Sequence, residues 1–204
     1  MWPSEENRRA FDARFGPDED RRLPAELPDV AGKHVLHLGC RRGSASEALH
    51  ARGALVTALD VDESDLAAAR ERAPDALFVR GRIDDIPLEQ RRGRFDLVYA
   101  DEVLSAVADL TAFAQGVAAA LKAGGTLLLV DEHPAAICVD PIDLRWREDW
   151  FALPALGPLV TALAAHQLVL ERLEERPALP PRRLDSRVPA TYLLVAIKAA
   201  TARA

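Results

Sequence analysis

Short apolar runs and segments of helical period alternate along most of the chain. The apolar runs are continuous rather than alternating, which is typical of parallel strands covered on both faces. They predict strands at Lys33–Leu38, Leu55–Leu59, Ala76–Val79, Phe95–Ala100, Thr126–Val130, Leu168–Leu173 and Thr191–Lys198. The segments between them predict helices at Ser44–Arg52, Glu63–Arg72, Leu110–Lys122 and Leu156–Ala165. This order predicts a doubly wound α/β fold.

Two regions do not follow the alternation. Residues 5–15 predict a short helix, and residues 16–32 contain several prolines, which are typical of an irregular arm. Residues 1–32 are therefore expected to form an N-terminal helix and arm, a cap on one domain that spans residues 33–204. Residues 135–155 are rich in Asp, Arg and Trp without a clear period, and we expect a lid-like insertion there.

The composition excludes several classes of protein. The 204 residues, 49% of them hydrophobic, are enough for one domain with a sizeable core. A net charge of -6 argues against a protein that binds nucleic acid through its phosphates. No apolar stretch is long enough to span a bilayer, and the polar N-terminus does not resemble a signal peptide. The two cysteines, Cys40 and Cys138, form no disulfide framework and no metal motif. We expect a cytoplasmic protein without a bound metal.

One junction between a strand and a helix carries candidate chemistry. The first apolar run ends at Gly39, Gly43 follows, and a helical segment begins. Such a turn brings the backbone close to a ligand and directs N–H groups at it. The second apolar run ends in Asp60, where a carboxylate can accept hydrogen bonds from both hydroxyls of a ribose. The pair predicts a nucleoside-containing cofactor. The alternatives are a plain strand-to-helix turn and, for Asp60, a helix cap.

The ordered set of motifs resembles the class I S-adenosylmethionine-dependent methyltransferases, in particular a bacterial small-molecule branch. It comprises VLHLGCRRGS (35–44), ALDVDESDLAAAR (58–70), FVRGRIDDIP (78–87), FDLVYADEVLSAVADL (95–110), LKAGGTLLLVDEHP (121–134) and ATYLLVAIK (190–198). The resemblance implies a Rossmann-like, doubly wound, seven-stranded and mostly parallel sheet with an antiparallel last strand. It also implies S-adenosylmethionine as the cofactor and S-adenosylhomocysteine as the product.

The resemblance further implies a set of cofactor-binding residues. They are Gly39, Cys40, Gly43, Asp60, Val61, Asp84 and Asp101. The glycine turn would line the amino-acid portion and the ribose. Asp60 would accept the ribose hydroxyls, and Val61 would pack on the adenine. Asp101 or Glu102 would lie beside the sulfonium and the substrate.

Basic residues and a histidine stand at positions where relatives carry acidic or small residues. His37 takes the place of an acid that helps to hold the cofactor's ammonium group, and Arg41 and Arg42 replace small residues of the turn. Arg82 takes the place of an aspartate that reads the adenine amino group. These departures raise the hypothesis that cofactor binding is rearranged or lost.

Arg82 cannot replace an aspartate chemically, because the adenine amino group and the guanidinium are both donors. Asp84 or Asp85 would take over the adenine contact if the loop shifts. Alternatively, Arg82 stacks on adenine or pairs with Asp84.

His133 is the candidate general base, because it follows the fifth predicted strand at the ligand edge of the sheet. A base is needed only if the methyl acceptor must lose a proton. The alternative is a histidine that caps the strand end or pairs with Asp131 or Glu132.

The candidate substrate contacts are Glu102, His133, Trp146 and Trp150. The two tryptophans lie in the lid-like insertion, where aromatic faces can bind a planar or apolar acceptor. The alternatives are that the tryptophans anchor this loop to the core and that Glu102 orders its own loop.

The sequence therefore predicts a methyltransferase that acts on a small molecule, with specialised metabolism as the suggested setting. The expected partner is a small-molecule substrate, with no nucleic acid and no membrane, and the protein is expected to be a monomer or homodimer. The alternative keeps the fold but not the reaction: a non-methylating enzyme, or a binding or regulatory partner. A nicotinamide-dependent oxidoreductase is a third hypothesis, disfavoured by the imperfect glycine turn.

Overall fold

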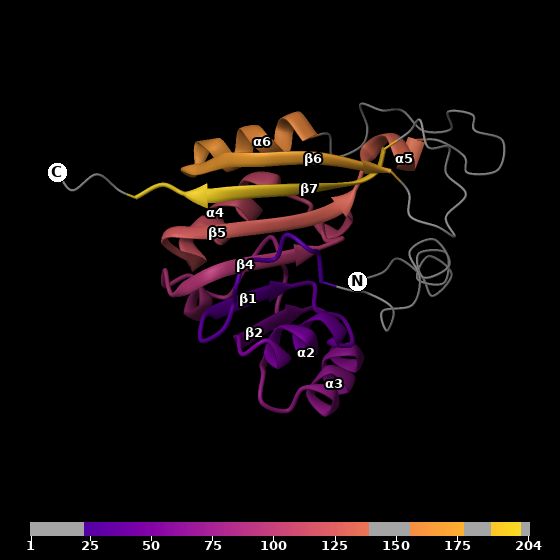
Figure 1. Cartoon of the computed structure of the whole chain (residues 1–204), viewed down its shortest axis with the longest axis vertical. Coiled ribbons are helices and arrows are strands. Elements are labelled where there is room, and N and C mark those ends of the chain that lie inside the picture. Colours follow the sequence, from indigo (N-terminus) through magenta and orange to yellow (C-terminus); the bar gives the residue numbers. More distant parts are fainter. Residues whose placement is uncertain (1–22, 139–155, 178–188, 201–204) are drawn as a thin grey trace.

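The computed structural model describes residues 23–138, 156–177 and 189–200 (Figure 1). The predicted helix at 5–15 lies outside the described residues, as do Trp146 and Trp150 and most of the lid-like insertion. Within the described ranges, no helix is long and apolar enough to cross a membrane.

A seven-stranded sheet forms the centre of the fold, in the order β3-β2-β1-β4-β5-β7-β6. Its strands are β1 His34–Leu38, β2 Leu55–Asp60, β3 Leu77–Arg80, β4 Phe95–Asp101, β5 Leu121–Glu132, β6 Leu168–Pro177 and β7 Pro189–Lys198. The first five strands pair in parallel, whereas β7 is antiparallel to both β5 and β6. In Figure 1 the arrowhead of β7 points opposite to that of β5. The predicted mostly parallel sheet with an antiparallel last strand is confirmed.

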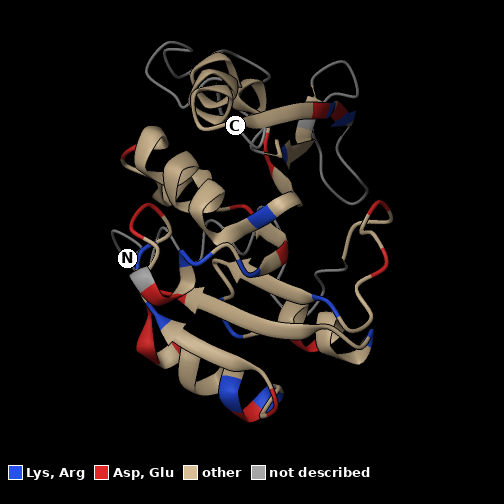
Figure 2. Ribbon diagram, turned by 90° about the vertical axis from the view of Figure 1, so that its left-hand side faces the viewer, with Lys and Arg blue, Asp and Glu red and all other residues tan. Residues whose placement is uncertain are grey.

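Helices cover both faces of this sheet. The described α-helices are α2 Ser44–Ala51, α3 Glu63–Arg72, α4 Leu110–Ala120, α5 Pro134–Cys138 and α6 Leu156–Ala165. Two short 3-10 helices, η2 Leu88–Gln90 and η3 Leu104–Ala106, lie in the loops. Basic and acidic residues are interspersed along the ribbon in Figure 2 rather than gathered on one side.

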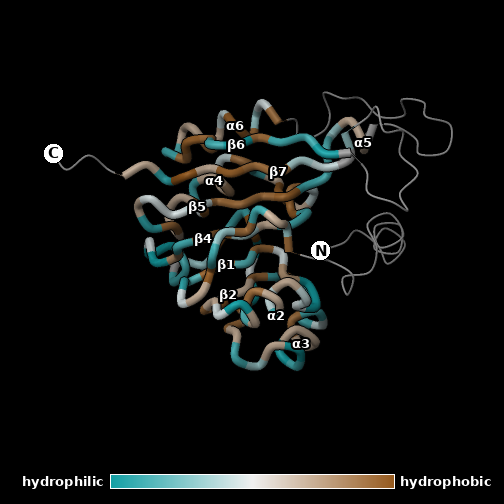
Figure 3. Tube along the Cα trace, viewed as in Figure 1, coloured by the Kyte–Doolittle hydropathy of each residue, from teal (hydrophilic) through white to brown (hydrophobic). Residues whose placement is uncertain are grey.

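Each face of the sheet has its own apolar core. One core contains Phe113 of α4 and Leu163 of α6, and the other contains Leu49 of α2 and Leu66 of α3. Figure 3 shows hydrophobic residues along β5 and β7, and hydrophilic residues along much of the edge strand β6. The two-sided burial explains why the inner strands are continuous apolar runs.

The described part of the N-terminal arm packs onto the second core. Leu27 and Val30 of the arm are buried there. Glu26 of the arm pairs with Arg176 of β6 at 2.6 Å. The hydrogen bond from Arg176 holds the pKa of the Glu26 carboxyl below its usual value. These contacts tie residues 23–32 to the domain that the arm was expected to cap.

The start of β5 differs from the prediction. Helix α4 ends at Ala120 rather than Lys122, and β5 begins at Leu121 rather than Thr126. Leu121 already pairs with Phe95 of β4, ahead of an irregularity in the register. Gly124, with φ 76, lies at this irregularity. Gly124 and Gly125 therefore lie within an irregular strand rather than between a helix and a strand.

The carboxyl ends of the inner parallel strands meet at one edge of the sheet. The strand order reverses at β1, which has β2 on one side and β4 on the other. Ligands of open α/β sheets bind outside the carboxyl ends of the strands at such a reversal. This edge therefore carries the glycine turn after β1, Asp60 at the end of β2, Glu102 after β4 and His133 after β5.

Candidate cofactor and active site

The two glycines of the turn after β1 have positive φ angles, 70 for Gly39 and 85 for Gly43. A Cβ added at Gly39 would lie 2.6 Å from Val103 Cγ1, and one at Gly43 would lie 2.8 Å from Ala69 Cβ. Both glycines are thus required by the close approach of other parts of the protein. The shape of the turn is fixed by this packing, independently of a ligand.

Two further residues near the turn face the core. Cys40 is buried, and its Sγ lies 3.8 Å from the Arg41 carbonyl oxygen. His37 is buried on β1, where its Nδ1 lies 2.8 Å from Ser46 Oγ and its ring is 5.2 Å from that of Tyr99. His37 thus makes its hydrogen bond within the core.

Asp60 is held by backbone amides at the end of β2. Its Oδ2 accepts a hydrogen bond from Arg41 N at 2.7 Å, and its Oδ1 accepts one from Asp62 N at 3.0 Å. A carboxylate oxygen can accept two hydrogen bonds, so each oxygen retains one acceptor position. The helix cap, which was the alternative role for Asp60, is made by Asp62 instead: its carboxylate accepts from the amides of Ser64 and Asp65 at the start of α3.

Val61 lies between these two aspartates. It is half-buried, and its carbonyl oxygen accepts a hydrogen bond from Arg80 Nε at 3.2 Å. Its predicted contact with adenine stays a prediction.

Arg41 connects the turn after β1 to the end of β4. Its Nη2 lies 3.3 Å from the carbonyl oxygen of Glu102 and 3.6 Å from Glu102 Oε2. The two side chains are only 15% and 10% exposed. Both residues have positive φ, 47 for Arg41 and 50 for Glu102. Asp101, predicted to lie near the sulfonium, is the half-buried residue before Glu102.

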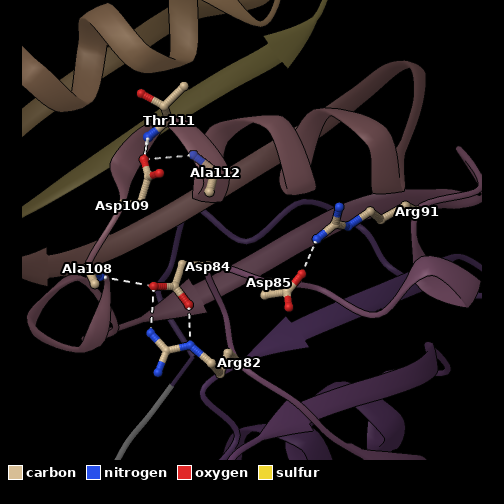
Figure 4. A network of polar contacts seen from close by, with 8 residues as sticks. All are labelled: Arg82, Asp84, Asp85, Arg91, Ala108, Asp109, Thr111 and Ala112. Atoms are coloured by element: carbon tan, nitrogen blue, oxygen red, sulfur yellow. Dashed lines mark hydrogen bonds and ion pairs between the residues drawn. The ribbon is translucent and has the colours of Figure 1, made fainter.

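Arg82 binds Asp84 through two hydrogen bonds (Figure 4). Arg82 Nε donates to Oδ1 at 2.9 Å, and Nη2 donates to Oδ2 at 2.8 Å. Ala108 N also donates to Asp84 Oδ2, at 3.1 Å. Burial raises the pKa of Asp84, but the bonds from Arg82 and Ala108 outweigh burial and hold this pKa below its usual value. The expected pairing of Arg82 with Asp84 is confirmed.

Asp85, the other candidate for adenine, pairs with Arg91 at 2.7 Å (Figure 4). Asp84 instead organises the loop that leads to α4, whose N-terminus is capped by Asp109. The contact between Asp84 and adenine stays a prediction.

Asp131 also belongs to the site. Its place in the sequence suggested only one role for it, as a partner of His133. Its Oδ2 accepts from the amides of Val103 and Leu104, both at 2.9 Å, and its Oδ1 accepts from Glu132 N at 2.8 Å. Burial raises the pKa of Asp131 to about 7, the three amide bonds oppose this rise, and the nearby Glu102 carboxylate adds to it. Asp131 thus positions the loop that follows Glu102. The signal in the sequence was an aspartate at the end of the most apolar strand.

His133 is buried, and both of its ring nitrogens make hydrogen bonds. Nδ1 accepts from Ala135 N at 3.1 Å, so Nε2 carries the hydrogen and donates to Glu175 Oε1 at 2.9 Å. The ring meets that of Tyr192 edge-on. Glu175 of β6 is thus a carboxylate partner of this ring that the sequence did not suggest. A role as a base requires one of these bonds to open.

The class of protein follows from this geometry. A doubly wound sheet with a glycine turn after β1 and a carboxylate with open acceptor positions after β2 defines a protein that binds a nucleoside-containing cofactor.

Comparisons with known proteins give the family. The profile of a methyltransferase domain matches residues 36–129. A ubiquinone biosynthesis O-methyltransferase of Xanthomonas oryzae is 32% identical over 189 residues, which are 83% of this chain and 78% of that protein. This protein belongs to the S-adenosylmethionine-dependent methyltransferases, whose cofactor is S-adenosylmethionine. Membership of this family rules out the hypothesis of a nicotinamide-dependent oxidoreductase.

Two further matches agree with this family. An uncharacterized methyltransferase of Synechocystis is 36% identical over 121 residues, 58% of this chain. The chain spans about half the length of that relative, 56%. The crystal structure of an S-adenosylmethionine-dependent methyltransferase from Mesorhizobium loti superimposes with a TM-score of 0.71 at 26% identity, and covers 85% of this chain and 94% of its own.

Proposed function

We propose that this protein transfers the methyl group of S-adenosylmethionine to a small molecule. The observation that carries the proposal is Asp60, which stands at the reversal of the strand order with one acceptor position left on each oxygen. Two adjacent acceptors of this kind suit the two hydroxyls of a ribose. The cofactor supplies an electrophilic methyl group on a sulfonium, and the residues of the chain supply binding and orientation.

The remaining cofactor contacts follow the same edge of the sheet. The turn at 39–43 would hold the amino-acid portion, Val61 would pack on the adenine, and Asp101 would lie near the sulfonium. Asp131 supports this arrangement indirectly, because it fixes the backbone of residues 103–104. Arg82 cannot make the contact to adenine that an aspartate makes at this position in relatives. Its two hydrogen bonds to Asp84 hold both side chains in place.

The acceptor would lie between the ends of β4 and β5, beside Glu102 and His133. Trp146 and Trp150 remain substrate candidates outside the described residues. A small acceptor is supported by the net charge of -6, which disfavours a nucleic acid held through its phosphates. The name of the Xanthomonas relative supports a small molecule as well. Specialised metabolism is the setting we propose.

Proton removal by His133 would require a change in the hydrogen bonds of its ring. In this conformation Nδ1 is occupied by the Ala135 amide and Nε2–H by Glu175. His133 would accept a proton from a substrate only after the bond to Ala135 opens.

The alternative function is a methyltransferase fold that does not methylate. It is favoured by Arg41, which stands in the glycine turn and reaches Glu102 across the reversal of the strand order. The experiment that separates the two functions supplies S-adenosylmethionine with a panel of small phenols, amines, thiols and carboxylic acids, and measures release of S-adenosylhomocysteine. Acceptor-dependent release supports methyl transfer. Cofactor binding without release across the panel would support the alternative.

A further inference from the structure

Glu175 brings a carboxylate to the ligand edge from β6, the last strand in the order of the sheet. Strands β5 and β6 are both antiparallel to β7, so they run in the same direction and end at the same edge. Glu175 lies near the end of β6, and its Oε1 accepts a hydrogen bond from His133 Nε2 at 2.9 Å. Its side chain is 56% exposed. Glu175 is therefore held in place and is also accessible to a molecule that binds beside His133.

Three side chains form a row across the sheet at this edge. Tyr192 of β7 is directly opposite Asp131 of β5 on one side and Glu175 of β6 on the other. Opposite residues of antiparallel strands point to the same face of a sheet, so the Tyr192 side chain lies between two carboxylates. The His133 ring meets the Tyr192 ring edge-on, with 6.3 Å between the ring centroids. The row and His133 thus form one cluster.

The hydroxyl of Tyr192 indicates that this row meets a ligand. Tyr192 is 1% exposed, and no described residue forms a hydrogen bond with its hydroxyl. A buried tyrosine hydroxyl usually has such a partner, because an unpaired polar group costs free energy inside a protein. Burial and the charge of Asp131 both raise the pKa of the Tyr192 hydroxyl, so it stays protonated. A molecule bound at this row would supply the missing partner.

The charges around Glu175 disfavour an anionic ligand. No described arginine or lysine forms an ion pair with Glu175. The next residue, Arg176, points to the opposite face of the sheet, where it pairs with Glu26 at 2.6 Å. A phenolate or a carboxylate at the row would therefore lie beside Asp131 and Glu175 without a described cation to balance its charge.

A neutral amine matches this row and needs no general base. The N–C bond to the methyl group forms through the lone pair of the amine while the C–S bond breaks, and the electron pair of the C–S bond stays on sulfur. The positive charge of the sulfonium thus moves to nitrogen, and the product leaves as a methylammonium ion. A carboxylate that accepts a hydrogen bond from the amine stabilises this developing charge more than it stabilises the neutral amine.

We propose that Glu175 selects amines as methyl acceptors, with its Oε2 accepting an N–H of the amine and the Tyr192 hydroxyl providing a second contact. The inference rests on the proposed function, because it names the acceptor class of the same reaction. His133 is then a positioning residue, which holds Glu175 through Nε2 while Ala135 holds Nδ1.

The test uses the full chain with S-adenosylmethionine and the panel of phenols, amines, thiols and carboxylic acids described above. Tyramine is added, because it carries an amine and a phenol in one molecule. The main variant is Glu175→Gln, which keeps an acceptor oxygen for His133. The matched control is Glu174→Gln, which removes the same charge from the opposite face of β6, where Glu174 pairs with Arg176.

We expect methyl transfer to amines and, on tyramine, to nitrogen rather than oxygen, as located by mass spectrometry. Glu175→Gln should lower kcat/KM for amines about 5- to 30-fold, as for the loss of a partly exposed charged partner. Calorimetry should show an unchanged affinity for S-adenosylhomocysteine. Glu174→Gln should leave both quantities within about twofold.

Tyr192→Phe tests the second contact, because it keeps the ring beside His133 and removes only the hydroxyl. It should lower kcat/KM for amines about 3- to 10-fold. The melting temperature should not fall, since no described residue loses a hydrogen bond. A lower melting temperature with unchanged kcat/KM would overturn the role of Tyr192.

Four results would overturn the assignment of Glu175. Methyl transfer only to phenols, thiols or carboxylic acids would contradict it and leave the proposed function standing. An unchanged kcat/KM for amines in Glu175→Gln would mean that Glu175 does not contact the acceptor. An equal fall in Glu174→Gln would mean that only the net charge of the strand matters. If no acceptor gives release of S-adenosylhomocysteine, the proposed function fails, and the assignment of amines fails with it.

Discussion

The two halves of the ligand edge use their polar residues differently. At the ends of β1 and β2, Asp60 is held by two backbone amides and retains acceptor positions. At the end of β5, Asp131 accepts three amide bonds in a buried position, and both nitrogens of His133 are bound within the protein. The first half thus leaves acceptor positions open on Asp60, whereas the second half uses its groups to hold loops in place. A polar residue at the ligand edge is therefore not evidence of catalysis until its partners are known.

The largest expected effect comes from Asp131→Ala. The substitution leaves the amides of Val103, Leu104 and Glu132 without their acceptor, in a buried position where unpaired donors are costly. We expect a loss of about 3–5 kcal/mol in the free energy of unfolding, measured by denaturant titration. Asp131→Asn, which keeps an acceptor oxygen of the same size, should cost much less. A loss below about 1 kcal/mol for the alanine variant would contradict the positioning role.

The second effect is the dependence of stability on pH. Burial raises the pKa of Asp131 from 3.8 to about 7. Between these values the folded protein holds a proton that the unfolded chain releases, so this contribution to stability is complete below about pH 4 and is lost as the pH rises through about 7. The Glu102 carboxylate raises this pKa further, and besides burial the charge of Asp131 in turn raises the pKa of Tyr192.

Unfolding measured from about pH 5 to about pH 8 should therefore show a fall of roughly 2–4 kcal/mol in the unmodified protein relative to Asp131→Asn. Parallel pH profiles for the two proteins would show that Asp131 ionises as it does in water.

The third effect separates Asp60 from Asp62, which lie two positions apart. Asp60→Ala removes the acceptor proposed for the ribose, so binding of S-adenosylhomocysteine should weaken by about 1–3 kcal/mol. Asp62→Ala removes only the cap of α3, which should cost about 1 kcal/mol of stability and leave the affinity unchanged. Calorimetry and thermal unfolding measure the two quantities. Equal affinities of the two variants would contradict the assignment of Asp60.

The smallest effect concerns His133. If its ring serves to hold Ala135 and Glu175, His133→Ala should lower kcat less than about tenfold and lower the melting temperature. A general base would cost about 10²- to 10⁴-fold in kcat with unchanged cofactor affinity. Steady-state kinetics with a substrate that the enzyme methylates distinguishes these two outcomes. A loss of kcat in the range of a general base would mean that the end of β5 takes part in catalysis, and the contrast between the two halves of the edge would then fail.

Much of the fold could be predicted from the sequence, because burial on both faces makes the inner strands continuous apolar runs. The start of β5 could not be predicted. Gly124 and Gly125 have the local signature of a helix end, but pairing of Leu121 with Phe95 extends the strand past them. Strand pairing here overrides local propensity.

The candidate site could be predicted only in part. The cap that Asp62 provides follows from its place directly before a helical segment. The partners of Asp131 and His133 depend on contacts between residues far apart in the chain. Val103 is brought to Asp131 by the loop after β4, and Glu175 is brought to His133 by the register of β6 on β7. No local pattern of residue types carries this information.

The most direct test is a crystal structure of the protein with S-adenosylhomocysteine. We predict that both ribose hydroxyls donate to Asp60 and that His133 still binds Ala135 and Glu175. A ribose bound away from Asp60, or a His133 ring turned toward the ligand with its two bonds broken, would contradict the division of the edge into a binding half and a supporting half.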